Sequence, residues 1–129
     1  MQFLIALAAL AIQASPPPAP QWEAFHSDAE GTFEVDTGRL TREGDQVEAW
    51  VRQIYPRPAP PFGMKAFILH SRVDCRRRRA TTYSMEGFTE DGTSLGLIDY
   101  PENERPNERV SRQGGDGAML RRLCGGASE

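Results

Sequence analysis

The two cysteines, Cys75 and Cys124, are the residues of this chain whose type and spacing carry the clearest chemistry. A redox-active pair is usually close in sequence, as in Cys-x-x-Cys, and no histidine lies at zinc-ligand spacing to either cysteine. We therefore expect the two to form a structural disulfide. Such a bridge closes a loop of about 50 residues and stabilises the fold by roughly 4 kcal/mol in the chain-entropy model.

A run of consecutive arginines directly follows the first cysteine. It comprises Arg76, Arg77, Arg78 and Arg79. Guanidinium groups form bidentate hydrogen bonds to sulfate, phosphate and carboxylate groups, so the run is a candidate contact for a polyanion or an acidic partner. The simpler interpretation, which we favour, is a solvated hairpin turn whose charge is balanced by nearby acids such as Asp74 and Glu90.

Other candidates for catalysis or ligand binding are few. His26 and His70 do not belong to a Ser/His/Asp signature. The sequence contains no recognisable paired-carboxylate, phosphate-loop or metal-binding motif. Trp50 and Phe62 have the side chains that line binding grooves, although we favour packing in the core. We therefore predict that the protein is not an enzyme and has no metal or cofactor.

The residues that carry this chemistry must be positioned by a small domain of nearly balanced charge. The formal net charge is −3, whereas a general nucleic-acid binder shows a strong basic excess. Twelve glycines and ten prolines indicate many turns and few long helices. We expect a single domain that does not bind nucleic acid and whose partner is a protein or an anionic surface polymer.

The N-terminal residues 1–14 have the pattern of a secretory signal peptide. Residues 3–12 form an apolar run that spans about 15 Å as a helix, which is half of a hydrocarbon core. Small residues and prolines follow, so we place cleavage after Ala14, with Ser15 as the near alternative. An ordinary buried helix is disfavoured because the prolines end it at once. Residues 15–21 are expected to form a mobile proline-rich leader.

The predicted signal peptide implies that the mature protein is exported from the cytoplasm. After the signal peptide, no stretch is apolar enough to cross a bilayer, so we expect a mature protein without a transmembrane segment. A periplasmic or secreted location agrees with the predicted disulfide, because such bonds persist in oxidising compartments.

Short period-two patterns predict antiparallel strands over much of the chain. The expected strands cover residues 22–26, 32–36, 46–55, 65–75, a segment that contains 81–85, and 94–98. The side chains expected to face inward are Phe33, Val35, Val47, Ala49, Val51, Phe67, Leu69, Val73, Cys75, Thr81, Tyr83, Met85, Leu95 and Leu97. Those expected to face outward include Thr32, Glu34 and Asp36. Residues 46–55 also carry Trp50 and Ile54 on the other face, which is typical of a central strand.

The remaining segments predict turns, loops and one helix. Residues 56–61 are expected to form a surface loop, because proline cannot donate sheet hydrogen bonds, and residues 100–115 to form a longer loop. A short helix follows residues 114–117 (GGDG), with Asp116 as its N-cap. Its predicted apolar stripe comprises Met119, Leu120, Leu123 and Cys124, with Arg121 and Arg122 in solvent. Residues 125–126 end the helix, and residues 126–129 form a disordered tail.

Together these elements predict an α+β, mostly β, fold. We expect an antiparallel sheet of about six strands with a short C-terminal helix packed on it and linked to it by the disulfide. The domain is expected to span residues 22–125.

Several segments of the chain match the pattern of a known protein family. These are residues 39–51 (RLTREGDQVEAWV) with the following Tyr-Pro, residues 73–75 with the basic run, Tyr83, residues 91–92, and the helix ending at residues 123–124. Over residues 22–125 the chain resembles the surface-adhesin protein E-like family of bacterial extracytoplasmic proteins. The resemblance implies an antiparallel sheet whose C-terminal helix is bridged to it by this cysteine pair. The founding member of the family binds host extracellular-matrix and plasma proteins.

Two functional hypotheses follow. The leading one is a non-enzymatic extracytoplasmic module of the bacterial envelope that binds a protein or a surface polymer. The alternative is an inhibitor of an exported hydrolase such as lysozyme, in which a protruding loop such as residues 56–61 enters the active site. This alternative rests on analogy with other small exported β-domains.

Overall fold

A computed structural model describes residues 18–125, which form one antiparallel sheet with a single α-helix. The strands are β1 (Trp22–Asp28), β2 (Gly31–Asp36), β3 (Thr41–Glu43), β4 (Gln46–Ala59), β5 (Met64–Asp74), β6 (Arg79–Thr89), β7 (Ser94–Asp99) and β8 (Asn107–Arg109). The helix is α1 (Gly114–Cys124), and two short 3-10 turns are η1 (Thr37–Arg39) and η2 (Glu102–Glu104). The predicted α+β fold with a C-terminal helix is confirmed, with eight strands in place of six. The predicted signal peptide and tail lie outside the described residues.

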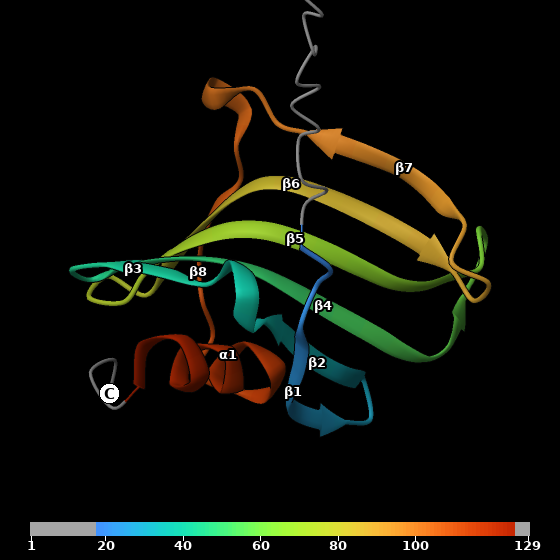
Figure 1. Ribbon diagram of the computed structural model, residues 1–129, viewed down its shortest axis with the longest axis horizontal. Coiled ribbons are helices and arrows are strands. Elements are labelled where there is room, and N and C mark those ends of the chain that lie inside the picture. The colour runs from blue at the N-terminus through green and yellow to red at the C-terminus, as the bar shows by residue number, and fades with distance from the viewer. Residues whose placement is uncertain (1–17, 126–129) are drawn as a thin grey trace, which may run out of the picture.

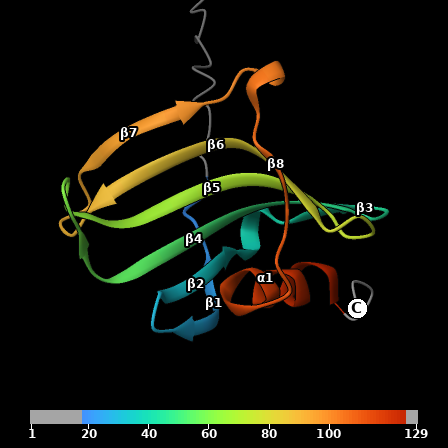
Figure 2. The ribbon, with the colours of Figure 1, turned by 180° about the vertical axis from the view of Figure 1, so that it is seen from behind.

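The sheet has the strand order β1-β2-β4-β5-β6-β7, and each neighbouring pair is antiparallel. The short strands β3 and β8 pair with β4 and β6. Figures 1 and 2 show the sheet curving over α1, which lies on one face beside β1 and β2. The strand β7 forms the opposite edge of the sheet.

The hydrophobic core lies between the sheet and α1. Its fully buried members include Val35 from β2, Val47 from β4, Val73 from β5 and Leu123 from α1. This confirms the predicted inward faces of these strands and the apolar stripe of the helix. Burying a valine or leucine side chain stabilises the fold by about 1.5–3 kcal/mol, so these contacts hold α1 on the sheet independently of the disulfide.

The helix begins earlier than the sequence predicts. Gln113 is the N-cap, and Asp116 lies inside the first turn rather than capping it. Gly115 packs against the ring of Phe33, and Gly117 against the backbone carbonyl of Arg112, with no room for a Cβ at either position. These glycines therefore serve close packing within the helix, although glycine usually weakens a helix. The predicted end is confirmed, since the C-cap residue 125 has φ +63°.

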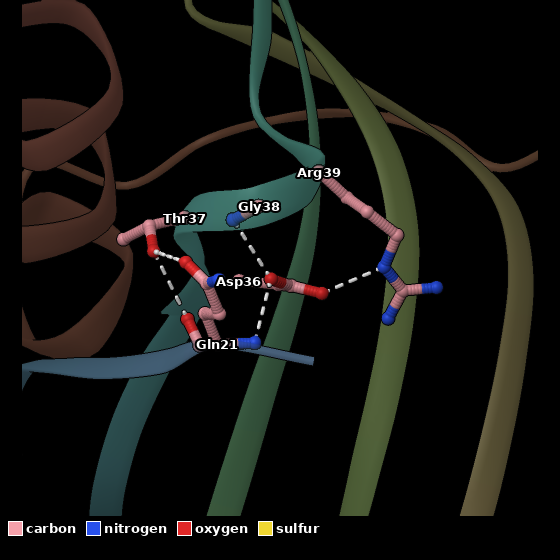
Figure 3. A network of polar contacts seen from close by, with 5 residues as sticks. All are labelled: Gln21, Asp36, Thr37, Gly38 and Arg39. Carbon is pink, nitrogen blue, oxygen red and sulfur yellow. Dashed lines mark hydrogen bonds and ion pairs between the residues drawn. The ribbon is translucent and has the colours of Figure 1, made fainter. Parts of the chain in front are cut away.

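Asp36 was predicted to face solvent, but it is buried, with 1% of its surface exposed. Figure 3 shows its carboxylate accepting hydrogen bonds from the backbone N–H groups of Gln21 (3.0 Å) and Gly38 (2.9 Å) and from Arg39 Nε (2.6 Å). Burial alone would raise the pKa of Asp36, but these hydrogen bonds outweigh it and hold that pKa below its ordinary value. Gln21, the last residue of the predicted mobile leader, is thereby tied to the domain.

The predicted inward positions on β6 are partly wrong because the strand contains a bulge. The register between β5 and β6 shifts between His70 and Ser71. Thr82 consequently lines the core side beside Ser71, whereas Tyr83 contacts His70 on the opposite face. A one-residue shift moves side chains to the other face of a strand, and alternation in sequence cannot reveal it. Thr81 is also outward, opposite Arg72, whereas Met85 lies opposite Leu69 and keeps its predicted face.

Two predicted loops contain strand structure. β4 continues through Pro56 to Ala59, with a register shift after Ile54 that tolerates the prolines. Within residues 100–115, the three residues of β8 pair with β6, and Val110 is buried. β8 is exposed on all its residues, so it has no apolar alternation by which to recognise it. Leu95 and Leu97 of β7, predicted inward, are instead 43% and 62% exposed, because β7 is an edge strand far from α1.

Candidate functional site: an arginine cluster beside the disulfide

The predicted disulfide between Cys75 and Cys124 is present. It joins the residue that follows β5 to the last residue of α1. The backbone around it is held as well, because the N–H of Cys75 donates to the carbonyl of Asp45 (2.8 Å) and Arg42 of β3 donates to the carbonyl of Leu123. The arginines lie in the turn that follows Cys75. The position of this turn is therefore fixed at its first residue.

The consecutive arginines do not act as one group. The backbone N–H and the guanidinium of Arg77 both approach the carboxylate of Asp74, at 3.0 and 4.0 Å. Arg79 opens β6 and donates to the side chain and carbonyl of Asn107 (2.6 and 2.9 Å). The predicted balance by Asp74 is thus confirmed for one arginine. Balance by Glu90 is wrong, because that residue follows the far end of β6, roughly 30 Å away.

Arg78 is held against a segment that is distant in sequence. Its backbone has φ +53°, the left-handed conformation, and its carbonyl accepts a hydrogen bond from the N–H of Val110 (2.8 Å). This contact brings the turn beside residues 109–112. Partial desolvation, followed by the like charges of Arg112 and Arg109, lowers the pKa of Arg78, although an arginine remains protonated at neutral pH. We call Arg78, Arg109 and Arg112 the arginine cluster.

The arginine cluster is electrostatically unfavourable by itself. Arg109 lies directly opposite Arg79 in the β6–β8 pair, and like charges at such positions destabilise a sheet. Among the described residues, none of the three cluster arginines forms an ion pair with an acid. An arrangement of this kind is suited to an anionic partner. Sequence reasoning identified Arg78 but missed Arg109 and Arg112, because they lie in a segment predicted as an irregular loop.

A cavity of about 170 Å³ lies next to the arginine cluster, between the sheet and α1. Its apolar lining includes Phe33, Val51, Phe67 and Leu69, and its polar lining includes Gln53, Glu108, Arg109 and Asp116. Partial desolvation, with a smaller contribution from Glu108, raises the pKa of Asp116. The cavity is smaller than the 300–1,000 Å³ typical of sites for organic ligands, so its volume does not match a cofactor site.

The outer face of the sheet carries a row of stacked rings instead of a second layer. The rings of Trp50 and His70 are parallel with centroids 4.1 Å apart, and Tyr83 follows at 5.0 Å from His70. Arg39 lies over Trp50 at one end of the row, and Arg105 over Tyr83 at the other. Each cation–π contact contributes about 0.5–2 kcal/mol. Trp50 is therefore packed, on the face opposite the core, and its ring is occupied by neighbours.

The other candidate residues form no catalytic arrangement. His26 and His70 each approach one carboxylate, Asp28 at 2.8 Å and Glu48 at 2.9 Å. His70 is half-buried on its strand. Phe62, for which core packing was favoured, is instead 77% exposed in the turn between β4 and β5. Within residues 18–125 there is no group of three potential metal ligands, and no helix combines the length and apolarity needed to span a membrane.

Comparison with known proteins identifies the family. The sequence profile described as surface-adhesin protein E matches residues 22–125. The chain belongs to the surface-adhesin protein E family. This confirms the resemblance noted in the sequence and its extent, and it supports an adhesin-like envelope protein. No curated protein matches the chain by sequence.

Two solved structures of Haemophilus influenzae protein E resemble the fold. One, a second crystal form, has a TM-score of 0.56 at 11% identity, covering 92% of this chain and all of the other. The second has a TM-score of 0.54 at 10% identity, covering 89% of this chain and 93% of the other. At such low identity the likeness concerns the fold alone.

Proposed function

We propose that this protein is a non-enzymatic binding module of the bacterial envelope, exported to the periplasm or the cell surface, and that its arginine cluster contacts an anionic polymer. The observation that carries the proposal is the convergence of Arg78, Arg109 and Arg112 from two distant segments, without an acidic partner among the described residues. Membership in an adhesin family and the disulfide both support an exported binding protein.

The chemistry of the cluster favours sulfate or phosphate groups carried on a chain. Arginine binds such groups through two parallel N–H donors, which gives direction as well as charge. A polymer places several anions in register with several guanidinium groups, so that each contact after the first occurs at high effective concentration. The fixed backbone of Arg78 reduces the ordering cost of binding, because the turn need not rearrange.

Retention on immobilised heparin tests the proposal. A variant with Arg78→Ser, Arg109→Ser and Arg112→Ser should elute at much lower salt. Three lost contacts of about 1 kcal/mol each correspond to a roughly hundredfold weaker affinity. The matched control replaces the exposed arginines 57, 72 and 121 by serine, which changes the net charge equally. Equal loss of retention in both variants would show that overall charge, rather than the cluster, binds the polymer.

Inhibition of an exported hydrolase is the competing proposal. The observation that favours it is the turn between β4 and β5, where Phe62 is exposed enough to enter a substrate cleft. A lysozyme-inhibition assay with the purified protein and with Phe62→Ser separates the two proposals. The binding-module proposal predicts no inhibition by either protein, whereas inhibition that disappears in the variant would favour the inhibitor.

A further inference from the structure

The large apolar side chains that remain exposed in the described structure lie in only two places. Leu95, Leu97 and Ile98 of β7 are 43%, 62% and 46% exposed, and Phe62 lies in the turn between β4 and β5. Three of these four residues thus belong to one six-residue strand. Figures 1 and 2 show that this strand is the outermost of the sheet, on the side away from β1.

The outer edge of β7 has the properties of a strand that can accept a further strand. In a terminal antiparallel strand, alternate backbone N–H and C=O groups point away from the sheet and remain available for pairing. Proteins usually protect such an edge with proline, lysine or an inward charge. β7 contains neither proline nor lysine, and its one charged residue, Asp99, lies at its end. A bulge at Leu95 and the hydrogen bond from the N–H of Gly96 to Ser94 Oγ (3.1 Å) protect only the start of the strand. This edge therefore combines free hydrogen-bonding groups with apolar side chains.

The charges around β7 indicate which kind of strand it accepts. Residues 86–104 contain no lysine, arginine or histidine. They contain the carboxylates Glu86, Glu90, Asp91, Asp99, Glu102 and Glu104. A pair of β7 strands from two copies would bring these two acidic surroundings together. The resulting repulsion of like charges disfavours a second copy, and the same carboxylates disfavour an anionic membrane. A basic peptide is the complementary partner.

We propose that β7 binds an extended segment of a partner protein as an added strand. The segment carries apolar side chains on both of its faces, which cover Leu95 and Ile98 on one face of β7 and Leu97 on the other. It carries lysine or arginine at its ends, which approach the flanking carboxylates. Backbone hydrogen bonds supply affinity, and the side chains and charges supply specificity. This surface lies towards the opposite end of β6 from the arginine cluster, so it is independent of polymer binding.

Selection from a library of linear nine-residue peptides tests this inference directly. The purified protein serves as the target, with counter-selection on Leu97→Lys, which places a charge on the edge. We expect enriched peptides with a central run of valine, isoleucine or tyrosine and terminal lysine or arginine. A synthetic consensus peptide should protect the amides of residues 94–99 from hydrogen exchange. Selection of acidic peptides, or protection located elsewhere, would overturn the proposal.

Matched variants distinguish strand addition from non-specific hydrophobic binding. Leu97→Lys should weaken the consensus peptide at least tenfold, whereas Phe62→Lys, with the same change in charge at another exposed apolar residue, should leave binding unchanged. Glu90→Gln combined with Asp99→Asn should also weaken it, and N-methylation of alternate peptide amides should abolish binding. Unchanged binding after N-methylation would exclude an added strand. A concentration-dependent dimer that Leu97→Lys abolishes would assign the edge to a second copy and also overturn the proposal.

Discussion

At the scale of single residues, buried Asp36 illustrates how one carboxylate organises a chain segment. It joins the segment that precedes β1, the turn η1 and the cation that covers Trp50. From its position at the end of a strand with alternating polarity, the sequence predicts that the side chain of Asp36 is exposed to solvent. Burial occurs because three donors converge on it, two of them from its own turn. Only the Asp-Thr-Gly turn pattern hints at this role in the sequence.

Replacing Asp36 by alanine should lower the free energy of unfolding by about 3 kcal/mol, because the N–H groups of Gln21 and Gly38 and the guanidinium of Arg39 lose their acceptor. Urea unfolding followed by circular dichroism measures this change. Asp99→Ala, which removes an exposed carboxylate at the end of β7, is the control and should cost less than 1 kcal/mol. A loss below 1 kcal/mol for the Asp36 variant would contradict the role assigned to this residue.

The same carboxylate predicts a pH dependence of stability. The pKa of Asp36 is lower in the folded state than its ordinary value of 3.8, so the unfolded state takes up a proton first as the pH falls. Its contribution is therefore complete above the unfolded pKa and is lost as the pH falls through the folded pKa. We therefore expect the free energy of unfolding, measured from pH 6 to pH 2.5, to decrease less with falling pH for Asp36→Asn than for the wild type.

At the scale of elements, the helix start depends on glycine for packing rather than for flexibility. Gly115→Ala introduces a methyl group against the ring of Phe33 and should destabilise the protein by about 1–3 kcal/mol, despite the high helix propensity of alanine. Arg121→Ala, at an exposed position in the same helix, should leave the stability of the protein nearly unchanged. Thermal unfolding compares the two. A stabilised Gly115 variant would contradict the close contact.

The disulfide fixes the opposite end of the same helix. Reduction removes a cross-link worth roughly 4 kcal/mol, which for a domain of this size lowers the Tm by roughly 15–20 °C. The far-ultraviolet spectrum should change little at low temperature, because the buried residues of α1 still contact the sheet. Calorimetry with and without reductant measures the shift. A change below about 3 °C would contradict the stabilising role of the bridge.

Elements with a repeated apolar pattern were predictable from the sequence, and those that depend on long-range register were not. Val47, Ala49 and Val51 indicated the central strand, and the spacing of the helical stripe placed Cys124 inward. The face of Tyr83 was not predictable, because the bulge arises from pairing with β5. β8 was missed since its stabilisation comes from pairing with β6 alone. Because β8 was missed, the sequence identified only Arg78 of the three arginines in the cluster.

At the scale of the whole molecule, a net charge of −3 conceals a separation of charge. The arginine cluster lies where β6 begins, next to β8 and the disulfide. Glu86, Glu90 and Asp91 lie towards the far end of β6, whereas Asp99, Glu102 and Glu104 lie at the end of β7 and in η2, where the chain returns towards β8. Figure 1 shows this course of the chain. A folded chain with two such regions can bind two partners of opposite charge at once. Composition alone argues against a general nucleic-acid binder but gives no sign of this division.

The proposed function depends on joint contact of Arg78, Arg109 and Arg112 with an anionic polymer. The most direct measurement is nuclear magnetic resonance of the arginine Nε–Hε groups during titration with a heparin hexasaccharide. The signals of these three arginines should shift together and saturate at one ratio, while those of Arg39 and Arg52, which are already paired with acids, should stay unchanged. Shifts that spread over all arginines, or that omit these three, would contradict the proposed function.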